Sequence, residues 1–196
     1  MSRELPGRAP RAKKRFGQNF LTNPDIIARI VQVVRPQPSD HMIEIGPGRG
    51  AMTYALIEKL SQLSVVEIDD AIIPYLKEHC VCPEKLQVYH ADALAFDFAQ
   101  MFPDVTLRLV GNLPYNISSP LLFHFLSFSE KIKDMHVMLQ KEVVDRIVAG
   151  PGSKIYGRLS VMLQYYCHVE KLFTVPPCSF SPQPKVDSAI LRLITK

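Results

Sequence analysis

The chain has 196 residues, of which 47% are hydrophobic and 21% are charged, a balance typical of one globular domain with a full core. This composition excludes a disordered chain and a fibrous protein. No apolar run approaches the roughly 18 to 20 residues of a membrane span, and the start of the chain lacks the apolar core of a secretory signal. We therefore expect a cytoplasmic protein without a membrane partner.

The formal net charge of +4 is concentrated at the N-terminus. Six of the 23 basic side chains but only one of the 19 acidic ones lie in residues 1–15, so residues 16–196 carry 17 basic and 18 acidic groups. This composition predicts a flexible basic arm over residues 1–15 ahead of one domain over residues 16–196. The natural partner of such an arm is a polyanion such as nucleic acid. A solubilising tail and an organelle transit peptide are the alternatives, although the prolines and the missing amphipathic repeat argue against the second.

The predicted domain alternates apolar runs with helical patterns, an order typical of a parallel sheet covered on both faces. Asn23 and Pro24 resemble the N-cap and the first residue of a helix whose apolar face continues to Val34. This helix precedes the first strand of the sheet. Strands are expected at residues 42–45, 64–68, 86–89, 106–110 and 135–139, with helical stretches between most of them. The pattern predicts an α/β fold with a doubly wound sheet.

A break at residues 150–152, Gly-Pro-Gly, separates this pattern from the last elements. A helical segment is expected at residues 157–164 and two further strands at 165–173 and 188–194. These two strands could pair as an antiparallel hairpin at the edge of the sheet, although the periodicity leaves their order open.

The four cysteines form no C-x-x-C pair, which argues against a disulfide framework or a structural zinc site in a chain of this size. His79 lies close to Cys80 and Cys82, but four ligands at the usual spacing are missing. We therefore expect no metal ion, and any chemistry must come from other side chains.

The first strand runs into a glycine-rich loop, EIGPGRG at residues 44–50. Gly46, Gly48 and Gly50 let the backbone turn sharply and approach a ligand before the next helix. The G-x-G-x-G spacing and the acidic Glu44 both differ from the dinucleotide fingerprint, so they disfavour NAD.

Acidic residues also stand at the ends of the next two strands. Glu67, in VVEID, can accept both hydroxyls of a ribose, and Asp92, in HADA, can accept from the amine of an adenine beside the amide of Ala93. Either acid alone could instead be a helix cap or a solvated turn. Together with Glu44 they suit an adenosine ligand without phosphates and a cationic sulfonium, because phosphates would favour Lys or Arg.

The fourth strand ends in VGNLPYNISSP at residues 110–120, where Asn112, Pro114 and Tyr115 follow an apolar run. One interpretation is a turn that contains a packed tyrosine. The other is that the strand end presents an amide and a flat ring to a ligand in the crevice of the sheet.

Four blocks of the sequence resemble those of the small-subunit rRNA adenine dimethyltransferases, which use S-adenosylmethionine to convert adenine to dimethyladenine. The blocks are FGQNFL at residues 16–21, EIGPGRG at 44–50, GNLPYNIS at 111–118 and FSPQPKVDS at 180–188. The resemblance implies a Rossmann-like, seven-stranded methyltransferase sheet with an antiparallel edge strand. It also implies S-adenosylmethionine as the cofactor and small-subunit ribosomal RNA as the partner.

The chain departs from the family in three places. Relatives usually carry an apolar residue at the position of Arg49 and often a basic one at that of Asp70, so cofactor affinity could differ. The family also continues into a small helical domain, which we expect to be absent because the chain ends at Lys196.

The resemblance and the chemistry of methyl transfer together define the expected site. The cofactor-binding residues are expected to be Gln18, Asn19, Leu21, Glu44, Gly46, Gly48, Gly50, Glu67, Ile68, Asp92, Ala93 and Asn112. The Asn112 side-chain oxygen and the Leu113 carbonyl are expected to hold the amine of a flipped adenine, with Pro114 keeping Leu113 extended. Tyr115 would stack on one face of the base and Phe180 on the other, unless Phe180 fills the core. No covalent nucleophile or dedicated general base is expected, because the methylated amine readily loses its proton to water.

Phosphate contacts are expected from basic residues of the arm and of the region around residues 150–152. They are Arg11, Lys13, Lys14, Arg15, Lys141, Arg146, Lys154, Arg158 and Lys185, each of which could instead be an ordinary solvated residue. We expect a monomer. Two rival functions stay open: an assembly factor that only binds ribosomal RNA, and a methyltransferase that acts on DNA adenine or on a different RNA.

Overall fold

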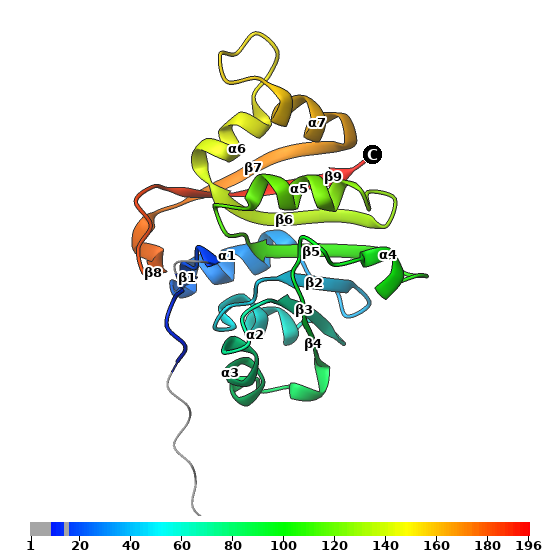
Figure 1. The fold of residues 1–196 in the computed structure, drawn as a ribbon, viewed down its shortest axis with the longest axis vertical. Coiled ribbons are helices and arrows are strands. Elements are labelled where there is room, and N and C mark those ends of the chain that lie inside the picture. Colours follow the sequence, from blue (N-terminus) through cyan, green and yellow to red (C-terminus); the bar gives the residue numbers. More distant parts are fainter. Residues whose placement is uncertain (1–8, 14–15) are drawn as a thin grey trace, which may run out of the picture.

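The computed structural model describes residues 9–13 and 16–196, and its main sheet has seven strands (Figure 1). The strands are β2 (His41–Ile45), β3 (Leu63–Glu67), β4 (Leu86–His90), β5 (Leu107–Asn112), β6 (Ile132–Gln140), β7 (Cys167–Val175) and β9 (Ser188–Thr195). Their order across the sheet is β4-β3-β2-β5-β6-β9-β7, and the first five of these are mutually parallel. The doubly wound sheet predicted from the alternating pattern is therefore confirmed.

The position of the antiparallel strand differs from the prediction. β9 pairs antiparallel with both β6 and β7, so it lies one place inside the edge, and β7 forms the edge. The two strands pair with each other as expected, but β9 inserts between β7 and the rest of the sheet. Insertion gives the largely buried β9 a hydrogen-bonding partner on each side, which a strand this apolar requires.

Helices cover both faces of the sheet (Figure 1). One face carries α1 (Pro24–Val34), α2 (Ala51–Ile57) and α3 (Ile72–His79), and the other carries α4 (Phe98–Met101), α5 (Ser118–Leu126), α6 (Lys141–Val148) and α7 (Arg158–Tyr166). Side chains alternate between the two cores along each strand; in β2, Met42 faces the first core and Ile43 the second. In the part of the chain that the structure describes, no helix has the length and apolarity to cross a bilayer.

Helix α1 begins where the sequence indicates. The Asn23 side chain accepts hydrogen bonds from the amides of Asp25 and Ile26 at 3.0 and 3.3 Å, and Pro24 occupies the first helical position. Val34, on the apolar face, is buried against the sheet.

Two very short strands bring together a segment near the start of the chain and a segment near its end. β1 (Phe20–Leu21) pairs antiparallel with β8 (Phe180–Ser181), so segments about 160 residues apart lie side by side (Figure 1). This pair was not predicted, because two-residue strands leave no periodicity in the sequence. It anchors the N-terminal segment beside the carboxyl ends of the parallel strands.

A buried ion cluster closes the opposite end of the sheet. The Arg108 guanidinium of β5 makes a bidentate pair with Asp134 of β6, at 2.8 and 2.9 Å, and a second pair with Asp40 at 2.6 Å. Arg108 also donates to the carbonyl of Val34 at 2.7 Å, which fixes the end of α1. The cluster holds the amino ends of the strands and leaves their carboxyl ends for a site.

Candidate active site

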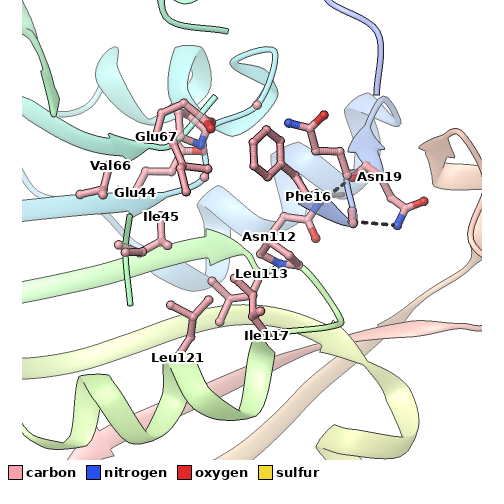
Figure 2. A pocket seen from close by; sticks show the side chains of 18 of the residues that line it. Phe16, Asn19, Glu44, Ile45, Val66, Glu67, Asn112, Leu113, Ile117 and Leu121 are labelled. Atoms are coloured by element: carbon pink, nitrogen blue, oxygen red, sulfur yellow. Dashed lines mark hydrogen bonds between the residues drawn. The ribbon is translucent and has the colours of Figure 1, made fainter. Parts of the chain in front are cut away.

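A cavity of about 270 Å³ opens at the carboxyl ends of β2, β3, β4 and β5. The chain reverses its direction of winding between β2 and β5, so the cavity lies at the switch point of the sheet, where open α/β sheets bind ligands. Its walls come from the glycine loop, the ends of β3, β4 and β5, and the N-terminal segment 16–21. Figure 2 shows side chains of these segments around one space, with the Phe16 ring between Glu67 and Asn112 in this view.

Eleven of the twelve expected cofactor-binding residues line this cavity, and Gly50 is the exception. Gly46 and Gly48 line it with positive φ values of 65° and 54°, a conformation that residues with a side chain rarely adopt. Gly50, with φ 87°, is the buried N-cap of α2, and a Cβ there would lie 2.4 Å from Cζ of Tyr54. Gly50 therefore shapes the start of the helix and is not among the residues that line the cavity, so its contact with the cofactor stays a prediction.

Glu44 lies in the floor of the cavity with 1% of its surface exposed. Burial raises the pKa of its carboxyl to about 8, although a hydrogen bond from Thr53 Oγ1 to Oε2 at 2.6 Å opposes the rise. The bond ties β2 to α2. Burial thus favours the neutral form of this carboxyl in the protein without a ligand.

Glu67 and Asp92 stand at the ends of neighbouring strands and have different surroundings. Glu67 is buried, and its Oε1 accepts from the amide of Asp69 at 2.8 Å. Burial raises the pKa of Glu67, while backbone hydrogen bonds, including one from Gly48, oppose the rise. Asp92 is exposed at the rim, and its Oδ1 accepts from the amide of Leu94 at 2.9 Å. In each carboxyl one oxygen accepts a hydrogen bond from a loop amide, as expected for a helix cap or a solvated turn. Both residues nevertheless also line the cavity.

Asn112, the last residue of β5, lines the cavity beside Leu113 (Figure 2). Its Nδ2 donates to the carbonyl of Asn19 at 2.8 Å. Because a carbonyl can only accept, this contact fixes which end of the amide is nitrogen, and Oδ1 is left as an acceptor. The Leu113 amide donates to the Met138 carbonyl at 3.1 Å, and the Leu113 side chain is buried.

Tyr115 lines the cavity, and its hydroxyl group forms a hydrogen bond within the protein. Its hydroxyl lies 2.5 Å from Oγ of Ser188, the fully buried first residue of β9. Burial raises the pKa of the Tyr115 hydroxyl, and the bond to Ser188 opposes the rise. The contact fixes the ring without using its faces.

Phe180 does not line the cavity, which contradicts its expected role as a stacking ring. It is 2% exposed and packs in the core shared by α1 and α2. The cause is its place in β8, where pairing with Leu21 of β1 turns the ring inward. The alternative interpretation, an aromatic residue that fills the core, is the correct one.

Some residues at the site were missed by sequence reasoning. Phe16 lines the cavity, Asp69 lies fully buried beside Glu67, and Ser188 holds Tyr115. Phe16 and Ser188 stand in sequence blocks already singled out, so those blocks could have indicated them. Asp69 stands in the quoted segment VVEID, but only the folded chain distinguishes it from the exposed Asp70 next to it.

The expected RNA contacts have mixed outcomes. Lys14 and Arg15 lie outside the described residues. Lys13 is bound within the protein, with Nζ 2.6 Å from Asp69, and Lys141 pairs with Asp145 at 2.7 Å. The remaining five side chains are exposed: Arg11, Arg146, Lys154, Arg158 and Lys185.

A groove of about 500 Å³ brings together Lys141 and Arg146 of α6 with Lys185 of the segment before β9. Acidic residues line it too, among them Glu142 and Asp187. The structure thus gathers three of the expected RNA contacts, but in a groove of mixed charge.

The mixed seven-stranded sheet and the cavity at its switch point define a ligand-binding α/β domain of the Rossmann-like class. A family model described as "Ribosomal RNA adenine dimethylase" matches residues 9–196. The chain belongs to this family.

Relatives of the chain include the ribosomal RNA small subunit methyltransferases A of Acidithiobacillus ferrooxidans, 59% identical, and Saccharophagus degradans, 57% identical. Each alignment covers 96% of this chain and 70% of the relative. Among solved structures, a dimethyladenosine transferase from Plasmodium falciparum is similar with 35% identity and a TM-score of 0.81, over 90% of this chain and 63% of that one. The 23S rRNA methyltransferase ErmE is similar with 30% identity and a TM-score of 0.77, over 91% of this chain and 70% of that one.

Proposed function

We propose that the protein transfers methyl groups from S-adenosylmethionine to the 6-amino group of adenines in small-subunit ribosomal RNA, to give N6,N6-dimethyladenine during ribosome biogenesis. The observation that carries this proposal is that Asn112 lines the same cavity as Glu67 and Asp92. An acceptor for an adenine amine thus faces the two acids suited to an adenosine-type cofactor. Family membership supports the choice of ribosomal RNA. We further propose that the protein acts in the cytoplasm as a monomer.

The residues of the cavity fit S-adenosylmethionine. Gly46 and Gly48 bring bare backbone to its floor, and Glu67 and Asp92 offer carboxylates to a ribose and an adenine. The one basic side chain in the described lining, Arg49, donates to the carbonyl of Pro10 at 2.6 and 2.9 Å, so two of its five N–H donors are used within the protein. The cofactor, when bound, supplies a methyl group on a positively charged sulfur.

Asn112 and Leu113 would hold the adenine amine. The lone pair of that nitrogen is delocalised into the ring, which makes it a poor nucleophile. Two acceptors, Oδ1 of Asn112 and the Leu113 carbonyl, would take its two hydrogens and favour a pyramidal nitrogen aimed at the methyl group. Pro114 disfavours helical backbone at Leu113, which keeps that carbonyl in place.

Tyr115 would stack on the base, which must leave its helix to reach the cavity. A stack of this kind contributes on the order of 1 to 3 kcal/mol. The bond from Tyr115 to Ser188 supports this role, because it holds the ring in one orientation before RNA arrives. We assign no general base, since the methylated amine is acidic enough to lose its proton to water.

Exposed basic residues would contact RNA phosphates outside the cavity. Arg146, Lys154 and Lys185 are exposed side chains near the loop 150–152 or in the groove beside α6. Replacing all three with glutamine should lower RNA affinity and reduce the slope of log affinity against log salt by about 2 to 3. An unchanged slope would show that these side chains do not bind phosphates.

Incubation with labelled S-adenosylmethionine and either immature small ribosomal subunits or duplex DNA tests the function. Label recovered as dimethyladenine in RNA is the expected result. Label in DNA would favour a DNA adenine methyltransferase, and tight RNA binding without label would favour an assembly factor. Asn112→Ala protein is the control that ties any label to this site.

A further inference from the structure

The N-terminal segment, part of which lines the cavity, is held by side chains at two points. We call the described residues 9–13 and 16–21 the strap. Arg49 of the glycine loop donates to the Pro10 carbonyl from two nitrogens, at 2.9 and 2.6 Å, and its guanidinium lies 4.4 Å from the centre of the Phe20 ring. One side chain of the glycine loop thus contacts the strap near both of its ends.

The second fastening is made by Asp69, which follows β3 and is fully buried. Its Oδ1 lies 2.6 Å from Nζ of Lys13, and its Oδ2 accepts from Nε2 of Gln18 at 3.1 Å. The Lys13 amide in turn donates to Oε1 of Gln18 at 2.8 Å. Lys13, Gln18 and Asp69 therefore form a closed network, and the buried carboxylate would lose two donors if the strap left.

The same network reaches the catalytic amide. Asn19, next to Gln18 in the strap, offers the carbonyl to which Asn112 donates at 2.8 Å. Asp69 also donates its own amide to Glu67 at 2.8 Å. The position of Asn19, and with it the orientation of the Asn112 side chain, therefore depends on how the strap is seated.

We propose that Asp69 is a positioning residue that locks the strap over the cavity, so that the Asn19 carbonyl holds the Asn112 amide with its oxygen towards the adenine. The inference rests on the proposed function only for its kinetic consequence. The contacts of Asp69 with Lys13 and Gln18, which we call the lock, are present in the protein without ligands. Asp69→Asn weakens it because the amide replaces one of the two acceptor oxygens and removes the negative charge opposite Lys13.

Hydrogen exchange of the ligand-free protein tests the lock directly. In Asp69→Asn the amides of Lys13 and Phe16, bonded to Gln18 Oε1 and to the Lys13 carbonyl, should exchange about 10-fold faster than in the wild type. Asp70→Asn is the matched control: Asp70 lies 3.7 Å from Lys13 with its side chain 80% exposed, so exchange should change by less than about twofold. Equal exchange in Asp69→Asn and the wild type would overturn the proposal.

Single-turnover methyl transfer tests the link to Asn112. We expect Asp69→Asn to slow transfer about 10-fold in the wild-type background and to have almost no further effect in the Asn112→Ala background. The same loss in both backgrounds would mean that Asp69 does not act through Asn112 and would overturn that link. Lys13→Gln, which removes the other partner at a partly exposed position, gives the same comparison if Asp69→Asn does not fold. If the wild type transfers no methyl group to RNA, the proposed function fails, while the exchange experiment still decides whether the lock exists.

Discussion

Replacing Asn112 with alanine removes two hydrogen-bonding groups that have different tasks. Its Nδ2 donates to Asn19 at 2.8 Å, a partly buried neutral bond that contributes about 1 kcal/mol to stability. In the proposed mechanism its Oδ1 accepts from the adenine amine, and a single group placed for the transition state contributes about 2.7–4 kcal/mol. Asn112→Ala should therefore lower kcat by about 10²–10³-fold while the free energy of unfolding falls by only about 1–2 kcal/mol.

Asn112→Asp is the matched control, because it keeps the shape and an oxygen towards the cavity but loses the donor to Asn19. Its kcat should exceed that of the alanine variant, and its stability should be below that of the wild type, since a carboxylate oxygen then faces the Asn19 carbonyl. Single-turnover transfer and urea denaturation measure the two quantities. If Asn112→Ala stays folded and transfers methyl groups within about threefold of the wild-type rate, the role assigned to Oδ1 is wrong.

Three further predictions concern side chains around the site and the core. Tyr115→Phe and Ser188→Ala remove the same 2.5 Å hydrogen bond, so in a double-mutant cycle on kcat/KM their effects should fall short of additivity by about 1 kcal/mol. Because burial raises the pKa of Glu44 from 4.5 to about 8, its contribution to stability is full below pH 4.5 and is lost as pH rises to about 8; Glu44→Gln should flatten this fall in urea midpoints. Arg108→Met leaves the buried Asp134 and the partly buried Asp40 unpaired and should cost about 3–5 kcal/mol in urea denaturation, whereas Arg192→Met, at an exposed pair, should cost under about 1 kcal/mol. Additive effects of Tyr115→Phe and Ser188→Ala would contradict the first prediction, and an unchanged pH profile of stability in Glu44→Gln would contradict the second. Equal losses of stability in Arg108→Met and Arg192→Met would contradict the third.

Local sequence patterns were sufficient to predict where most strands of the sheet lie. Short, largely apolar runs placed β2, β3, β5 and β6, because strands covered on both faces are apolar along most of their length. The edge strand β4, LQVYH, includes polar residues and is only partly buried. Asn23 and Pro24 marked the start of α1, since a helix cap is made by neighbouring residues. The insertion of β9 between β6 and β7 could not be predicted, because the partner of a strand is chosen by distant parts of the chain.

The site shows the same difference between features set by local sequence and features set by contacts between distant segments. Glu67, Asp92 and Asn112 were found because each stands at the end of a predicted strand, and parallel strands bring their carboxyl ends to one edge. Phe180 was misplaced because its ring direction depends on the pairing of β8 with β1, about 160 residues away in the chain. Asp69 was missed because its burial depends on the return of the strap, and neither its sequence neighbours nor its spacing reveal that contact.

The most direct test of the account is a crystal structure with a bisubstrate analogue, in which the N6 nitrogen of an adenosine is linked to the sulfur position of the cofactor. The account predicts that this nitrogen lies about 3 Å from both Oδ1 of Asn112 and the carbonyl oxygen of Leu113, with the ribose of the cofactor half at Glu67. A linked nitrogen more than about 4 Å from both oxygens, or a cofactor half outside the cavity, would contradict the central claim.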